Sequence, residues 1–243
     1  RQSNLCSEIM LHTGKDHLGQ DRTAVCCLSS VNAEKFMEWR DHPTFIEDVM
    51  RFLDNVLEDF ISRAPADMAK AVYAAQRERS VGLGLMGFHT FLQAQNVPFE
   101  SALAKSWNMR LFKHLRRHCD AASRKLAEER GPCPDAAERG VMERFSHKLA
   151  IAPTASISII CGGTSAGIEP IPANIYSHKT LSGTFAVRNP YLERLLEEKG
   201  LNTPAIWDSI LENEGSVQHL DGLSQDEKDV FKTAFEIDQR WIV

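Results

Sequence analysis

Two short stretches near the start of the chain contain apolar residues and flank a polar run that is typical of a turn. Asn4–Leu11 and Thr23–Val31 are predicted as strands, and the polar segment 13–21 between them as a turn. A long amphipathic helix is predicted next, because apolar residues recur at spacings of three and four along one face. These residues are Phe45, Val49, Phe52, Leu53, Val56, Leu57, Phe60 and Ile61.

Later stretches predict further helices, separated by short apolar runs. A long helix is expected over about Ser101–Glu129, ended by Gly131, while residues 149–176 hold short apolar runs broken by Gly, Ser, Thr and Pro. Three more helices are expected in the tail, opening at Asn189-Pro190, at Thr203-Pro204 and at the Ser224 capping box. Helices alternating with short strands predict an α/β class, and we see no repeat or linker, so we expect a single domain over residues 1–243.

Composition excludes few functions. A net charge of −5 gives no support to nucleic-acid binding, and no apolar run approaches the roughly 20 residues that span a membrane. The cysteines are too few for a disulfide scaffold and form no C-x-x-C motif, so a reducing cytoplasmic setting is expected. They are Cys6, Cys26, Cys27, Cys119, Cys133 and Cys161.

The two ends of the chain predict a piece of a longer protein. The chain begins at Arg1 rather than Met, and it ends on the apolar run Trp241-Ile242-Val243. An apolar end without a polar tail lacks a packing partner. We therefore expect one incomplete domain, truncated on both sides, in which the absence of a targeting signal carries little weight.

The first candidate site is the set Asn4, Cys6 and Glu8. Along a strand these residues would share one face, with neighbours roughly 7 Å apart. An amide, a thiol able to act in nucleophilic or one-electron chemistry, and a carboxylate base would then converge. The alternative is a half-buried strand with a core cysteine, since free cysteines are often buried.

Cys26 and Cys27 are the second candidate. Neighbouring residues of a strand point to opposite faces, so only one of the two thiols can meet Cys6. If Cys26 shares the site, the chain supplies a second thiol that could donate electrons. The alternative is a pair of small core residues.

Three further motifs carry weaker signals. Ile151–Ser158, entered through Pro153, resembles an anion cradle of small hydroxyl residues, although such turns are common. Gly82–Gly87 matches the G-x-G-x-x-G dinucleotide pattern, but polar residues precede it instead of a buried strand, which favours a close-packing role. His114 and His118 stand four apart on a helix, where nearby Arg and Lys favour a solvated basic face over a metal site.

Together these motifs resemble a known family. In this order, they closely resemble the large catalytic subunit of ribonucleotide reductase, over essentially the whole chain. The motifs are Ser3–Ile9, Val25–Asn32, Gly82–Gly87, Pro153–Ser156, Gly167–Pro170 and Ile175–Gly183. The resemblance implies part of a ten-stranded α/β barrel with a central finger loop. It also implies reduction of ribonucleoside diphosphates to 2′-deoxyribonucleoside diphosphates, as in the aerobic class I enzymes.

The resemblance also assigns roles to residues. It implies that Cys6 becomes a thiyl radical that abstracts the ribose 3′-hydrogen, that Glu8 takes the 3′-hydroxyl proton, and that Asn4 orients the ribose hydroxyls beside Ser3. Cys26 matches one of two reducing thiols, and Cys27 is a bystander. The substrate phosphates would be held by Thr154, Ala155, Ser156 and Ile157.

Cofactors and partners follow from the same resemblance. No cofactor or metal is expected on this segment itself. The parent protein would need a radical from a metal-containing small subunit, ATP or dNTP effectors, and thioredoxin or glutaredoxin as reductant, and would form a homodimer of large subunits. In the family, the second reducing cysteine and the effector regions precede this segment, while the radical-relay tyrosines and the C-terminal cysteines follow it.

Three other functions are weighed against this one. The class II enzymes, which use adenosylcobalamin, share the core motifs. A non-catalytic split or truncated module needing complementing chains would fit the isolated segment, because half of the dithiol is missing from it. A thiol hydrolase using Cys6 lacks a matched histidine, since His12 and His17 fall in the predicted turn.

Overall fold

The computed structural model describes residues 2–242, which divide into two compact units. One unit is formed by residues 2–86 and 110–155, and the other by residues 87–109 and 156–242. The long helix α5 (Ala102–Arg130) contributes residues to both units and confirms the helix predicted over this stretch.

The first unit begins with two small hairpins. β1 (Gln2–Ser3) pairs antiparallel with β2 (Met10–Leu11), and β3 (Gly14–Lys15) pairs with β4 (Asp21–Arg22). The strand predicted over Asn4–Leu11 is therefore wrong, because only its last two residues are a strand and residues 4–9 connect β1 to β2. Ser7 has a left-handed φ of +62°, which an extended strand cannot contain.

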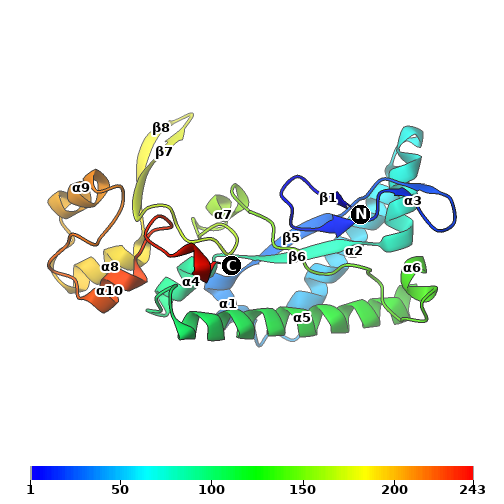
Figure 1. The fold of residues 1–243 in the computed structure, drawn as a ribbon, viewed down its shortest axis with the longest axis horizontal. Coiled ribbons are helices and arrows are strands. Elements are labelled where there is room, and N and C mark those ends of the chain that lie inside the picture. Colours follow the sequence, from blue (N-terminus) through cyan, green and yellow to red (C-terminus); the bar gives the residue numbers. More distant parts are fainter. Residues whose placement is uncertain (1, 243) are drawn as a thin grey trace. The chain divides into compact units, whose positions relative to one another are not determined.

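A parallel pair of strands lies beyond the hairpins. β5 (Cys27–Asn32) and β6 (Val81–Met86) run side by side, with Cys27 opposite Val81 (Figure 1). The second predicted strand is thus confirmed from Cys27 onward, and Cys26 lies just before it. The crossover holds η1 (Ala33–Lys35), α1 (Phe36–Trp39), α2 (Phe45–Arg63), η2 (Ala66–Met68) and α3 (Ala69–Glu78).

Strand β6 is buried along its whole length because it has neighbours on both edges. On the edge away from β5, the Leu83 N–H donates to the Lys148 carbonyl at 2.9 Å. A Cβ added to Gly82 would lie 2.7 Å from Cβ of Ala150, which is closer than real side chains approach. The close-packing interpretation of the glycine motif is confirmed.

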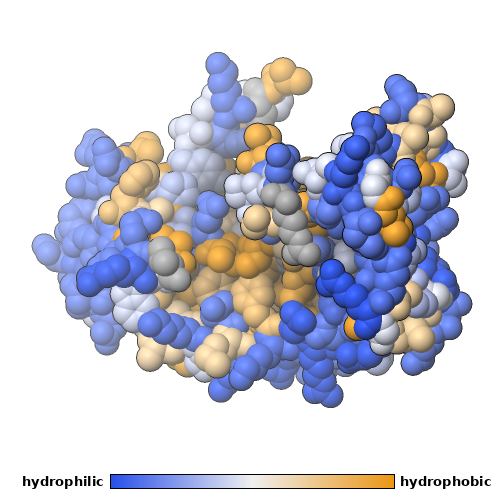
Figure 2. Space-filling model, turned by 45° about the vertical axis from the view of Figure 1, so that its right-hand side comes forward, coloured by the Kyte–Doolittle hydropathy of each residue, from blue (hydrophilic) through white to orange (hydrophobic). Residues whose placement is uncertain are grey.

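Helix α2 is where it was predicted, but its buried face is different. Ile46, Met50, Leu53 and Leu57 are buried, whereas Phe52 and Val56 are 62% and 40% exposed. The helix has two adjacent apolar stripes, and periodicity alone does not say which one packs on the strands. Exposed hydrophobic residues are not confined to α2, and Figure 2 shows orange patches among hydrophilic residues on one face of the protein.

After α5, the short helix α6 (Pro134–Ala137) completes the helices of the first unit. The second unit contains a strand hairpin and most of the remaining helices. Its β7 and β8 pair antiparallel, and this hairpin was not predicted because its residues are mostly exposed. The elements are α4 (Phe88–Ala94), α7 (Ile157–Ile160), β7 (Ile175–Thr180), β8 (Gly183–Arg188), α8 (Pro190–Glu198), α9 (Pro204–Glu212), α10 (Gln225–Val230) and η3 (Gln239–Trp241).

The three tail helices confirm the capping signals. The side chains of Asn189 and Thr203 cap α8 and α9, and Ser224 forms a complete capping box with Glu227 at α10. These helices enclose a core around Trp207, which is 1% exposed. Local cap chemistry was sufficient to locate all three helix starts.

A buried polar network centred on His89 crosses this unit. The Ile171 N–H donates to Nδ1 of His89 at 2.9 Å, so Nδ1 is an acceptor in the neutral ring. Gln93 contacts the other ring nitrogen at 3.4 Å and accepts a hydrogen bond from Asn189 Nδ2 at 3.0 Å. Burial lowers the pKa of His89 to about 4, because a charged imidazole would lose its hydration here.

This network predicts a loss of stability in mild acid. Between pH 6.5 and 4 the unfolded chain binds a proton at His89 that the folded chain excludes, so stability falls as pH falls through that window. We expect the free energy of unfolding to drop by about 2 kcal/mol from pH 7 to pH 5 through this residue. Urea titrations of the wild type and of His89→Asn at both pH values measure it. An equal pH dependence in the two proteins would contradict the assignment.

Candidate active site

The connection between β1 and β2 carries Asn4, Cys6 and Glu8. The Asn4 carbonyl accepts a hydrogen bond from the Ser7 N–H at 3.1 Å, and Asn4 Oδ1 accepts one from the Ile9 N–H at 3.3 Å. These bonds close a compact turn in which Cys6 is exposed. The predicted arrangement of the three side chains on one strand face is therefore wrong, because a turn does not alternate. Asn4 has a structural task here, which is to hold the turn closed.

Glu8 and Cys26 are brought together by the structure. Ile9 and Leu11 form an apolar cluster with Ala150, and Cys26 packs against it. Burial, followed by the neighbouring Cys27 and the carboxylates of Glu8 and Glu78, raises the pKa of the Cys26 thiol to about 12. The charge of Glu8 thus reaches the Cys26 sulfur, and at neutral pH Cys26 is a thiol rather than a thiolate.

One oxygen of the Glu8 carboxylate is buried without a hydrogen-bond partner among the described residues. A buried carboxylate oxygen normally has a donor, so its lack of one indicates a place for a polar group from outside the chain. Glu8 is therefore a half-buried base near the protonated Cys26 thiol, and it shares its loop with the exposed thiol of Cys6. Such a base can accept a proton from a hydroxyl-bearing ligand.

Cys27 and Ser3 flank this arrangement. Cys27 is half-buried at the start of β5, and burial raises the pKa of its thiol. Both it and Cys26 are free thiols. Ser3 is exposed on β1, opposite Met10.

The predicted phosphate loop is partly irregular. Thr154 is buried with a left-handed φ of +54°, and it ends the first unit together with Ala155. Ser156 and Ile157 are exposed and begin the second unit, where Ser156 precedes the four-residue helix α7. Small and hydroxyl-bearing residues in a turn are suited to an anion.

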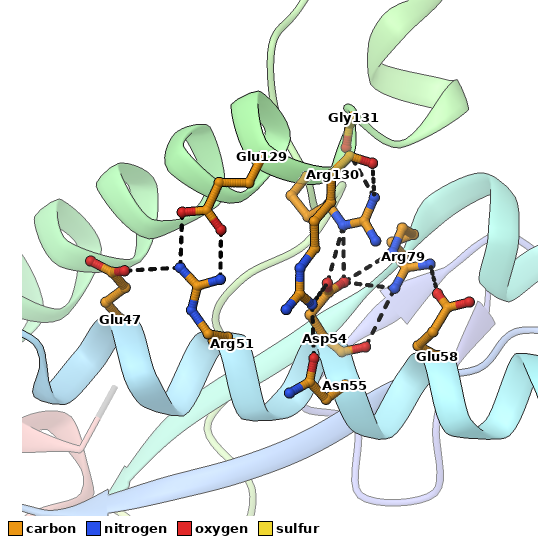
Figure 3. Close-up of polar contacts among 10 residues, drawn as sticks. Glu47, Arg51, Asp54, Asn55, Glu58, Arg79, Glu129, Arg130 and Gly131 are labelled. Carbon is orange, nitrogen blue, oxygen red and sulfur yellow. Dashed lines mark hydrogen bonds and ion pairs between the residues drawn. The ribbon is translucent and has the colours of Figure 1, made fainter.

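A buried ion cluster that the sequence did not reveal lies next to β6. The carboxylate of Asp54 is fully buried, and Oδ1 accepts hydrogen bonds from Nη2 of Arg79 at 2.7 Å and Nε of Arg144 at 3.0 Å, while Nη1 of Arg130 donates to Oδ2 at 2.7 Å. Figure 3 shows Arg79, which follows the end of α3, and Arg130, the last residue of α5, converging on Asp54. Burial alone would raise the pKa of Asp54, but the hydrogen bonds from Arg144 and Arg79 outweigh it and lower the pKa. The sequence signal that could have indicated this cluster is Asp54, a charged residue on the buried apolar face of α2.

A second ion cluster ties the β3–β4 hairpin to α3 and α6. Arg22, which is 4% exposed, donates to Asp16 Oδ2 at 2.9 Å and to Asp135 Oδ1 at 3.0 Å. The Tyr73 hydroxyl also donates to Asp16 Oδ2, at 3.0 Å. These contacts anchor the hairpin that precedes Cys26.

The histidine pair on α5 belongs to an aromatic cluster. The rings of His114 and His118 lie 4.3 Å apart, and His114 meets Phe36 and Trp39 edge-on. The prediction of a solvated basic face is therefore only partly correct, because His114 is half-buried and burial lowers its pKa. Across residues 2–242 we find neither a group of three potential ligands that could hold a metal ion nor a helix long and apolar enough to cross a membrane.

Comparisons with known proteins point to one family. The family model "Ribonucleotide reductase, barrel domain" matches residues 1–143 and 136–243. The ribonucleoside-diphosphate reductase large subunit of Invertebrate iridescent virus 6 is 48% identical over 98% of this chain and 24% of its own length. That of Invertebrate iridescent virus 3 is 46% identical over 100% of this chain and 38% of its own length.

A solved structure shares the fold. The class Id ribonucleotide reductase alpha subunit of Actinobacillus ureae superposes with a TM-score of 0.89 at 42% identity, covering 99% of this chain and 43% of that one. The α/β class and the barrel-type fold expected from the sequence are confirmed. The chain spans about a quarter to two fifths of the length of these relatives. It belongs to the ribonucleotide reductase large-subunit family, as part of the barrel domain.

Proposed function

We propose that residues 1–243 form part of the catalytic barrel domain of a class I ribonucleotide reductase, which reduces ribonucleoside diphosphates to 2′-deoxyribonucleoside diphosphates. The observation that carries this proposal is that Cys26 packs on the apolar cluster of Ile9, Leu11 and Ala150, within range of the charge of Glu8, which shares its loop with Cys6. The relatives support it, because two are named ribonucleoside-diphosphate reductase large subunits and one is a class Id ribonucleotide reductase alpha subunit.

Each site residue has a proposed role. The Cys6 sulfur, as a thiyl radical, takes the ribose 3′-hydrogen, and Glu8 takes the proton of the 3′-hydroxyl. The 2′-hydroxyl leaves as water, using a proton and electrons from Cys26 and a second thiol, which end as a disulfide. The Cys26 thiol suits this step because it holds its proton at neutral pH. The Cys6 thiol then returns the hydrogen to the 3′ carbon and becomes a thiyl radical again.

Substrate binding is assigned to the remaining residues. Asn4 and Ser3 would contact the ribose hydroxyls, and Asn4 would also keep the loop closed through the Ile9 N–H. The diphosphate would lie against the turn of small and hydroxyl residues, which comprises Thr154, Ala155, Ser156 and Ile157. Bound substrate would supply the donor that the buried oxygen of Glu8 lacks.

The proposal includes partners for the parent protein. A metal-containing small subunit would supply the radical, ATP and dNTPs would act as effectors, and thioredoxin or glutaredoxin would reduce the disulfide. The large subunit would act as a homodimer in the cytoplasm. Residues 1–243 would belong to a single catalytic barrel domain of that subunit.

A turnover assay of the parent protein tests the proposal. With a class I small subunit, a dithiol and a ribonucleoside diphosphate, we expect formation of the 2′-deoxy product. Omission of the small subunit should abolish it, and adenosylcobalamin should not restore it. Turnover that depends on adenosylcobalamin alone would select the class II alternative, and no turnover with any radical source would favour the non-catalytic module.

A further inference from the structure

Glu78 is a buried carboxylate with an unused oxygen. It ends α3, is 6% exposed, and its Oε2 has no hydrogen-bond partner among the described residues. Its Oε1 lies 3.8 Å from Nη1 of Arg22, which is a distant ion pair. Such a group normally has a donor, so this oxygen is available to a proton.

A polar cavity of about 360 Å³ reaches Glu78 from the surface of the first unit. Asp135 and Glu143 also line it, but their carboxylates are occupied. Asp135 accepts hydrogen bonds from Arg22, and Glu143 accepts one from Lys148 at 3.1 Å. Glu78 is therefore the acid of this lining whose carboxylate has a free oxygen, and the cavity is roomy enough for water.

Cys26 lies near the end of α3 that carries Glu78. The parallel register sets Cys27 against Val81, so Cys26 lies beside the turn that joins Glu78 to β6. The charge of Glu78 contributes to the raised pKa of Cys26. Burial, which outweighs the opposing charge of Arg22, raises the pKa of Glu78 itself, so it holds a proton to higher pH than an exposed carboxyl.

The other groups around this pair are accounted for. Arg22, Asp135 and the backbone and ring of His12 act on Glu78, and Glu8 and Cys27 act on Cys26. Cys133 is a buried thiol whose pKa is raised by burial and which also senses Glu78. The remaining ionisable residues of the cavity are Arg139, Glu143, His147 and Lys148.

We propose that Glu78 is a positioning residue that carries protons between the water of this cavity and the Cys26 sulfur when the active-site disulfide is reduced. This inference rests on the proposed function. An external dithiol attacks the disulfide at the sulfur bonded to Cys26. The S–S bond breaks, its electron pair goes to the Cys26 sulfur, and the proton of the Glu78 carboxylic acid goes to that sulfur.

The step balances without another reactant. The dithiol supplies two electrons and becomes a disulfide in a second exchange, and Glu78 regains its proton from cavity water. A thiol that holds its proton as firmly as Cys26 is a poor thiolate leaving group, so a proton donor accelerates its departure.

The test uses the full-length parent protein with its small subunit and compares the wild type with Glu78→Gln. A prereduced enzyme is first given substrate without reductant, and the product of one turnover is measured. Steady-state turnover with dithiothreitol is then measured from pH 6 to pH 9. We expect Glu78→Gln to keep the single-turnover yield but to lose about tenfold or more in the reductant-limited rate at pH 7. In the wild type this rate should fall as pH rises, because Glu78 loses its proton. In Glu78→Gln this fall should be absent.

Three results would overturn the proposal. If Glu78 acts only through its negative charge, removing that charge should make the Cys26 sulfur a better leaving group and the variant faster. A faster variant would therefore contradict proton transfer. An equal loss in both assays would indicate a structural role. An unchanged rate would indicate no role. Glu143→Gln, which removes a paired carboxylate from the same cavity, is the matched control and should leave both assays unchanged. A wild type that forms no product in the first assay would instead refute the proposed function, and this inference with it.

Discussion

Replacing Cys6 by serine in the full-length parent protein is expected to abolish turnover, with a loss of at least about a thousandfold. The proposed chemistry requires a sulfur-centred radical, and a serine hydroxyl, whose O–H bond is stronger than S–H, cannot replace it. The side chain is exposed on the β1–β2 loop, so the change removes no core packing. Product formation from a ribonucleoside diphosphate, measured with the small subunit present, is the readout.

Binding and a second cysteine provide the controls for this variant. Nucleotide affinity should be unchanged, because the loop is held by Asn4 and Ile9 rather than by the thiol. Cys119→Ala removes a buried thiol on α5, away from the loop, and should keep turnover within a few-fold of the wild type. Retained turnover in Cys6→Ser would sink the radical assignment.

Replacing Asp54 by asparagine is expected to cost about 3–5 kcal/mol in the free energy of unfolding. The carboxylate is fully buried and accepts hydrogen bonds from Arg79, Arg130 and Arg144, of which Figure 3 labels the first two. The amide would leave the charge of Arg144 buried without a counter-ion, and Arg79 would keep only its ion pair with Glu58. Because the pKa of Asp54 is lowered, its stabilisation is complete above its ordinary value of 3.8 and is lost as pH falls below it.

A matched exchange separates burial from charge. Glu129 on α5 pairs with Arg51 of α2 at 2.6 Å (Figure 3), and its side chain is 40% exposed. Glu129→Gln should cost less than about 1 kcal/mol, since water screens exposed ion pairs. Urea unfolding of both variants at pH 7 measures the difference. Similar losses in the free energy of unfolding of the two variants would show that the buried Asp54 cluster stabilises the fold no more than an exposed ion pair does.

The β1–β2 loop shows where local sequence rules fail. The stretch Asn4–Leu11, followed by turn-forming residues, predicts a strand. The hydrogen bonds of Asn4 and the left-handed Ser7 make a turn of residues 4–9 instead. A sequence of so few residues is compatible with both conformations, and only backbone pairing between β1 and β2 selects one of them.

The ionic clusters escaped prediction for a different reason. Asp54 and its arginines are up to ninety residues apart in the sequence. Nothing local indicates that Arg79, Arg130 and Arg144 meet one buried carboxylate. Glu78 is hidden in the same way, since the burial of its unpaired Oε2 depends on α3, α6 and β4 packing together.

The sequence by itself determined the family, the α/β class, the long helix of residues 102–130 and the three capped helices of the tail, because motifs, helix-ending residues and cap residues act over a few neighbouring positions. It also identified Cys6, Glu8 and Cys26 as candidates. Only the tertiary structure decided which stripe of α2 is buried, that residues 4–9 turn, and that Glu8 and Glu78 both act on Cys26. Burial and through-space charge depend on segments distant in the chain, and no local pattern encodes them.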